Sequence, residues 1–357
     1  MRLRILGCLL LSLTACTSES GPRAASSVPT PTPTATGSPS PLPSPAASAL
    51  PAADSLLLAV ADKRGGLALY AVSRGSHSAT LVRRLDGPPR HVVNRVSLSS
   101  GNSPTACVVW GPADVTSPSP RELRCYRPGS GAGRLVSDKA SYDVGVRADG
   151  RALAWTEGNQ DLVIADLAGD VATVRARMPY AEGAPPGGYP EGLGDLDWIG
   201  ARTLVGTAVG DSDESIGLCV IDLDHPRGHP GAGFGRCLRP QGAEAQKGYA
   251  HFEEAALVAP GEAVVVERGQ DCCGENDDAP AGRAVRLRLS DGAVLGVFAT
   301  PRDGREVVDV SGGARAVLYT TARDGKELAV SLRRAGEARG APLTGLPTDL
   351  LLATAQP

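Results

Sequence analysis

The chain has 357 residues, a formal net charge of −3 and 42% hydrophobic residues, of which few are aromatic. This length fits one large domain or two ordinary ones, and the apolar fraction supplies a core of valine, leucine, alanine and isoleucine. The slightly acidic balance excludes the bulk basicity of nucleic-acid-binding proteins, so we expect no nucleic-acid partner. The counts of 44 glycines and 29 prolines predict many turns.

The N-terminus carries a targeting signal. Two arginines precede an apolar stretch over 5–13, which is too short to cross a bilayer because a spanning helix needs about 20 apolar residues. This pattern is typical of a signal peptide. It ends in Leu13-Thr14-Ala15-Cys16, which resembles the bacterial lipobox. The resemblance implies that 1–15 are removed and that Cys16 receives diacylglycerol and palmitate; the alternative is an ordinary signal peptide with a chance cysteine.

Residues 16–54 are dominated by proline, serine, threonine and alanine, without periodicity. Such a segment buries too little apolar surface to offset its ordering entropy, and proline keeps it extended. We expect a disordered tether that holds the following domain away from a membrane. The predicted location is the extracytoplasmic face of the bacterial cell membrane, with the lipid as the link to the membrane.

From residue 55 onward the sequence reads as a repeated all-β unit. One unit has four strand-like runs separated by turn residues, at 141–146, 152–157, 161–167 and 171–177. Four antiparallel strands in a meander form one β-propeller blade. The glycine between first and second strands recurs about every 50 residues, at Gly101, Gly150, Gly200, Gly261 and Gly313. This period indicates an array of blades, and we predict a six-bladed propeller over 55–357.

The first blade is one strand short. Its three runs are 56–62, 67–73 and 79–85, and one further apolar run, 348–355, follows a complete sixth blade. We expect this last run to become the innermost strand of the first blade. Such closure removes the exposed sheet edges that promote aggregation.

Two segments resemble the repeat of WD40-like, TolB-type propellers: Val144-Gly145-Val146-Arg147-Ala148-Asp149-Gly150-Arg151-Ala152-Leu153-Ala154-Trp155 and Leu196-Asp197-Trp198-Ile199-Gly200-Ala201-Arg202-Thr203-Leu204. The resemblance covers about 55–355 and implies an actinobacterial lipoprotein with a six-bladed propeller. A true WD dipeptide is missing, so the resemblance does not extend to WD40 proteins proper. We expect the three tryptophans to pack between blades; they are Trp110, Trp155 and Trp198.

An even number of cysteines in a secreted chain predicts disulfides. Cys107 and Cys125 fall on neighbouring strands of the second blade, and Cys219 and Cys237 on neighbouring strands of the fourth. Each bridge closes a loop and stabilises the fold by about 3 kcal/mol. The remaining pair, Cys272-Cys273, is expected to form a vicinal disulfide that makes a loop rigid. The alternative is cofactor chemistry of the type seen in quinone-dependent propellers, whose eight blades and tryptophan motifs this chain lacks.

Long loops cluster on one predicted face, and two of them are acidic. They carry Asp211 and Asp213, and Asp277 and Asp278, whose carboxylates could bind calcium or a cationic partner if they converge. The alternative is solvated loop charge. His225 and His229 are four apart, but the prolines between and after them forbid the helix that usually presents such a metal pair. We expect no other cofactor.

We therefore predict a monomeric binding or scaffold lipoprotein that presents its loop-rich face to a protein or glycan, or that is a structural partner of an envelope complex. The rival hypothesis is a propeller enzyme, a hydrolase or an oxidoreductase, with a site in the central channel. It rests on acids and one histidine on or beside the first strands: Asp143, Asp195, Asp197, His251, Glu253, Glu254 and Asp309. No nucleophile elbow, P-loop or H-E-x-x-H motif accompanies them.

Overall fold

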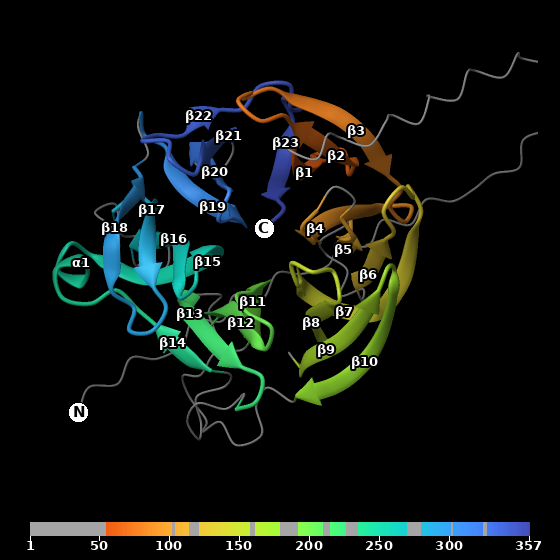
Figure 1. Ribbon diagram of the computed structural model, residues 1–357, viewed down its shortest axis with the longest axis horizontal. Helices are drawn as coiled ribbons and strands as arrows, with labels where there is room; N and C mark the ends of the chain where they lie inside the picture. Colours follow the sequence, from red (N-terminus) through yellow and green to blue (C-terminus); the bar gives the residue numbers. More distant parts are fainter. Residues whose placement is uncertain are drawn as a thin grey trace, which may run out of the picture. The chain divides into compact units, whose positions relative to one another are not determined.

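The computed structural model describes residues 55–101, 104–113, 121–157, 161–178, 192–209, 215–225, 235–269, 280–300, 303–323 and 327–357. These residues form six antiparallel blades of four strands around a common centre (Figure 1). The predicted all-β, six-bladed propeller is confirmed. The described helix α1 (Ala243–Gln246) is a single turn. In the described part of the chain, no helix is long and apolar enough to span a bilayer.

The strands are named here by blade, from the innermost strand outward. Blade 1 contains β23 (Leu350–Ala355), β1 (Leu56–Asp62), β2 (Leu67–Val72) and β3 (Ala79–Leu85). Blade 2 contains β4 (His91–Leu98), β5 (Ala106–Pro112), β6 (Arg121–Tyr126) and the first part of β7 (Gly133–Val146), and blade 3 the rest of β7, β8 (Ala152–Glu157), β9 (Asp161–Ala168) and β10 (Val171–Met178). Blade 4 contains β11 (Gly192–Trp198), β12 (Thr203–Val209), β13 (Ser215–Asp222) and β14 (Arg236–Leu238). Blade 5 contains β15 (Tyr249–Ala259), β16 (Glu262–Gly269), β17 (Arg283–Arg288) and β18 (Val294–Ala299), and blade 6 β19 (Glu306–Gly313), β20 (Ala316–Arg323), β21 (Glu327–Arg334) and β22 (Ala341–Pro342).

Strand β7 belongs to two blades. Its N-terminal part pairs with β6 as the outer strand of blade 2, and its C-terminal part pairs with β8 as the inner strand of blade 3. The sequence predicted a separate strand beginning at residue 141. The difference has a simple cause: no glycine or proline lies between Arg134 and Val144, so nothing breaks the extended backbone between the two blades.

The core consists of six apolar clusters, and each lies between two neighbouring blades. The predicted role of the tryptophans is confirmed, because Trp110, Trp155 and Trp198 are buried in three successive clusters. Each indole N–H donates a hydrogen bond, to Tyr126 Oη, Glu157 Oε1 and the Gly145 carbonyl respectively. A blade therefore buries its faces against its neighbours instead of forming a core of its own.

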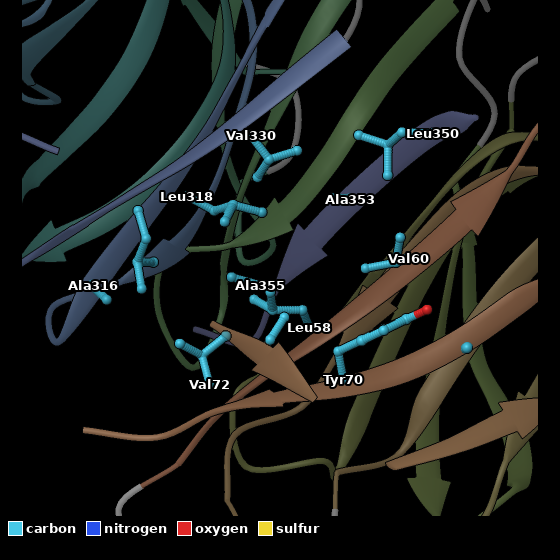
Figure 2. Packing of buried hydrophobic residues seen from close by; sticks show 13 residues of the cluster. Leu58, Val60, Tyr70, Val72, Ala316, Leu318, Val330, Leu350, Ala353 and Ala355 are labelled. Atoms are coloured by element: carbon cyan, nitrogen blue, oxygen red, sulfur yellow. The ribbon is translucent and has the colours of Figure 1, made fainter. Parts of the chain in front are cut away.

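The ring closes as predicted. Strand β23 pairs antiparallel with β1, with Val60 opposite Ala353 and Leu58 opposite Ala355. One apolar cluster then joins blade 1 to blade 6 (Figure 2). In it, Leu350, Ala353 and Ala355 of β23 contact residues of both blades, which include Tyr70 and Leu318. The two ends of the ring are thus held by a shared sheet and a shared core.

Both predicted disulfide pairs are present. Cys107 on β5 is bonded to Cys125 on β6, and Cys219 on β13 is bonded to Cys237 on β14. In each pair the two residues are directly opposite each other in the strand register. Cys16 and the adjacent Cys272 and Cys273 lie outside the described residues.

The closure makes a prediction about β23. Replacing Ala353, which is 1% exposed, by asparagine places an amide without partners in the cluster between blades 1 and 6. We expect Ala353→Asn to destabilise the whole ring by about 3 kcal/mol, because a buried unsatisfied polar group and overpacking act together. Thermal unfolding followed by circular dichroism should show a single transition at lower temperature.

Leu351→Asn is the matched control, because Leu351 lies on the same strand but is 36% exposed. It should change the free energy of unfolding by no more than about 1 kcal/mol. Equal effects of the two variants, or an early separate transition for Ala353→Asn, would contradict closure by β23.

Candidate functional site

The innermost strands converge at the centre of the ring, and five of them are irregular at the same level. A shift in strand register interrupts β4, β7, β11, β15 and β19, each time beside a charged residue. Asp195 and Glu254 lie in two of these bulges with φ of 53° and 46°. Left-handed backbone at a residue other than glycine costs about 1–3 kcal/mol and occurs where other contacts hold it.

Arg95 on β4 is the contact that holds these side chains. Its Nη1 and Nη2 atoms donate to Oε1 and Oε2 of Glu254, at 2.9 and 2.5 Å. Its Nε lies 3.4 Å from Oδ1 of Asp143, and its Nη1 lies 3.4 Å from Oδ1 of Asp195. Because these carboxylates come from blades 5, 3 and 4, one guanidinium links four blades across the centre.

Acids outnumber this arginine, and burial acts against their charge. Burial raises the pKa of Asp197 to about 7 and that of Asp309 to about 6. Burial, followed by repulsion from Asp195, also raises the pKa of Asp143, and the pKa of Glu254 is well above its usual range for the same primary reason. Burial opposes the charge of Arg95, but the carboxylates outweigh it and raise its pKa. The cluster therefore holds protons near neutral pH.

Little space remains beside the cluster. A cavity of about 40 Å³ is lined by Arg95, Asp197 and Pro357, together with parts of the inner strands. This volume accommodates two or three water molecules and is far below that of a small-molecule site. Pro357 lies at the centre of the ring (Figure 1), where its carbonyl oxygen accepts a hydrogen bond from Ser100 Oγ.

Serine hydroxyls join neighbouring inner strands next to the cluster. Ser97 Oγ accepts a hydrogen bond from the Val146 amide at 2.8 Å, which links β4 to β7. Ser311 Oγ accepts one from the Ala355 amide at 3.0 Å, which links β19 to β23. Polar side chains thus supply the contacts between inner strands that no sheet hydrogen bonding provides.

A second group of charges lies between blades 5 and 6. Arg268 Nε is 2.6 Å from Glu253 Oε2, and His251 Nε2 is 3.1 Å from Glu253 Oε1. Arg268 also lies 3.6 Å from Glu306. His251 and Glu253 therefore belong to an ion-pair network beside the centre and not to the Arg95 cluster.

The structure brings together most of the acids that the sequence placed on the inner strands. Asp143, Asp195 and Glu254 meet on Arg95, and Asp197 and Asp309 lie within its electrostatic reach. The sequence analysis missed Arg95 itself. The available signal was that a charged residue occupies the middle of the inner strand of blade 2, as in the following blades.

The other predicted site residues stay untested. Asp211, Asp213, Asp277, Asp278 and His229 lie outside the described residues, and calcium binding by the acidic loops remains a prediction. Among the residues that are described, no three of the His, Cys, Asp or Glu type are arranged to hold a metal ion. The described neighbour His225 is exposed and lies 3.5 Å from Asp222.

The Arg95 cluster predicts a specific dependence on pH. A carboxyl whose pKa is raised by folding binds more protons in the folded state, so stability falls as pH rises through about 6–7. Arg95→Met leaves the carboxylates without their cation and should lower the melting temperature at pH 8 by about 10 °C, which corresponds to about 3–5 kcal/mol. The pKa values of Asp143, Asp197, Glu254 and Asp309 are raised, so at pH 5.5 fewer negative charges remain near the missing cation and most of that loss should disappear. Calorimetry at the two pH values measures both effects.

Arg202→Met is the control, because the Arg202–Asp224 pair has side chains 60% and 52% exposed. Its effect should be within about 1 kcal/mol and should not depend on pH in this range. If Arg95→Met were equally destabilising at both pH values, the interpretation of the cluster as a shared-proton network would fail.

Comparison with known proteins supports the fold. No family model matches the sequence, and no curated protein matches it. Among solved structures, TolB from Acinetobacter baumannii is similar with a TM-score of 0.53 at 10% identity, over 85% of this chain and 66% of that chain. The chain thus spans just under two thirds of the TolB chain. At this identity the likeness is one of fold, and the described part of the chain has the fold of a TolB-like β-propeller.

Proposed function

We propose that this protein is an extracytoplasmic binding or scaffold lipoprotein that presents one face of its propeller to a protein or glycan. A single observation carries the proposal. Among the described residues, the Arg95 cluster and Pro357 lie at the centre of the ring, and the cavity that they line measures about 40 Å³. Recognition is then expected on a face of the ring, where a propeller offers a broad rigid surface.

The lengths of the connections favour one of the two faces. Two kinds of connection lie on the same side of the ring: those that join the second strand of a blade to the third, and those that join the outer strand of a blade to the inner strand of the next blade. We call this side the long-loop face. The segments between β5 and β6, between β10 and β11, between β14 and β15 and between β16 and β17 all belong to it. Long segments on a rigid scaffold are where binding residues concentrate.

The rival function, a propeller enzyme with a central site, draws on the same inner-strand acids. Here Asp143, Asp195 and Glu254 are paired with Arg95, and Glu253 is paired with Arg268. This arrangement favours a structural role for the acids, because a catalytic acid or base must reach a bound substrate. The scaffold function is therefore the better supported of the two.

Location and anchoring rest on two further observations. The segment Leu13-Thr14-Ala15-Cys16 resembles a lipobox, and 16–54 have the composition of a tether. The pairs Cys107–Cys125 and Cys219–Cys237 are disulfide-bonded, which is typical of proteins in oxidising compartments. Together they support a lipid-anchored protein outside the cytoplasm.

Loop replacement tests the proposed binding face. The test replaces 179–191 by a glycine-serine linker of equal length. The immobilised propeller is cross-linked to proteins and glycans in an envelope extract, and the captured molecules are identified by mass spectrometry. The replacement should abolish capture of the ligand. The matched control is the same replacement of 226–234, which connects β13 to β14 on the opposite face. Loss of the same cross-links in both variants, or in the control alone, would place binding elsewhere.

The anchor makes a separate prediction. Cys16→Ser should move the protein from the membrane fraction to the soluble fraction or block its processing, because the lipidated thiol is gone. Cys8→Ser changes a cysteine within the apolar stretch that would be removed, and it should leave fractionation unchanged. Fractionation with immunoblotting, and the mass of the mature N-terminal peptide, measure the result. An intact membrane association of Cys16→Ser would refute lipid anchoring at this residue.

A further inference from the structure

A cavity of about 480 Å³ lies at the seam where the ring closes, between blades 1 and 6. Its walls include Ser55, Arg74, Arg315, Arg334 and Gln356, together with Leu56, Val72, Ala316 and Ala335. Val72 and Ala316 mark one end of the apolar cluster in Figure 2. The volume falls within the range of small-molecule sites. These residues lie at first-to-second and third-to-fourth strand connections, so the cavity opens on the face opposite the long loops.

The charge of the cavity is strongly positive. Arg74 and Arg315 are exposed, and among the described residues neither guanidinium has a hydrogen bond or an ion pair. On the same face, Arg147, Arg202 and Arg288 each pair with an aspartate nearby. Of the three cavity arginines, Arg334 lies 3.8 Å from the carboxylate of Glu337.

Arg334 has a different task from the two unpaired arginines. Its Nη2 donates to the carbonyl oxygens of Ser73 and Ser76, and its Nη1 lies 3.3 Å from His77 Nε2. These bonds hold the β2–β3 turn of blade 1 against blade 6. The backbone of the turn that carries Arg74 is therefore held beside the cavity.

We propose that this cavity binds a small organic molecule that carries a phosphate or carboxylate group. The anionic group pairs with Arg74 and Arg315, whose planar guanidinium groups match such oxyanions. The carbon skeleton of the same molecule packs on Leu56, Val72 and Ala316, which line the cavity. The site is independent of the proposed loop-face ligand, because the two lie on opposite faces.

The test uses residues 46–357, which form one compact unit whose ring closes on itself. The probes are inorganic phosphate, glycerol 1-phosphate, and vesicles of phosphatidylglycerol or phosphatidylcholine, all at 0.15 M salt because exposed charges are screened. Isothermal titration calorimetry, vesicle sedimentation and melting temperature are the readouts. Glycerol 1-phosphate should bind and raise the melting temperature, since a ligand that binds only the folded state stabilises it.

Arg74→Gln combined with Arg315→Gln removes both unpaired charges and leaves the structural Arg334 unchanged. It should weaken binding at least tenfold. Arg339→Gln is the matched control, an exposed arginine of blade 6 outside the cavity lining, and it should bind as the parent protein does. Melting temperatures without ligand show that all variants are folded.

The probes distinguish a soluble ligand from a lipid headgroup. Binding of glycerol 1-phosphate with equal sedimentation on both vesicle types assigns the site to a soluble metabolite. Sedimentation with phosphatidylglycerol alone, lost in the double variant, assigns it to a lipid headgroup. The proposal is overturned if no probe binds. It is also overturned if Arg339→Gln weakens binding as much as the double variant does, because binding would then depend on the general positive charge of the surface and not on this cavity.

Discussion

The whole structure depends on the fact that no blade can bury its own faces. Each four-stranded sheet is apolar on both sides. The six clusters of core residues in the ring all lie between neighbouring blades. A row of such sheets would leave two apolar faces exposed at its ends, so the row must close into a ring. The pairing of β23 with β1 is the step that satisfies this requirement.

Closing the ring creates a second requirement at its centre. The inner strands approach one another there without sheet pairing between blades, so side chains must make the contacts. Serine hydroxyls join neighbouring strands, and Arg95 connects blades that are far apart around the ring. The cost is a group of buried acids with raised pKa values and left-handed backbone at Asp195 and Glu254. Stability and protonation are therefore linked at the point where all blades meet.

The sequence predicted most of this fold because strands and turns leave local signals. The runs at 56–62 and 152–157 match β1 and β8, and glycines with positive φ, such as Gly150 and Gly261, occupy the turns that the period located. The boundary of β7 was wrong because a strand that bends between sheets leaves no turn signal. Arg95 was missed because its partners Asp143, Asp195 and Glu254 lie one or more blades away in sequence. The cavity between blades 1 and 6 could not be predicted from the sequence either, because its walls come from segments that are far apart in the sequence.

The continuous strand β7 also affects how the ring can move. Between blades 1 and 2 and between blades 4 and 5, separate strands on either side of the connection belong to the two sheets. Between blades 2 and 3 the same hydrogen-bonded strand crosses the seam, and Ala140 pairs with both β6 and β8. Opening that seam would break sheet hydrogen bonds as well as apolar contacts, so breathing motions of the ring concentrate at the other seams. We therefore expect blades 2 and 3 to move as one unit relative to the other blades.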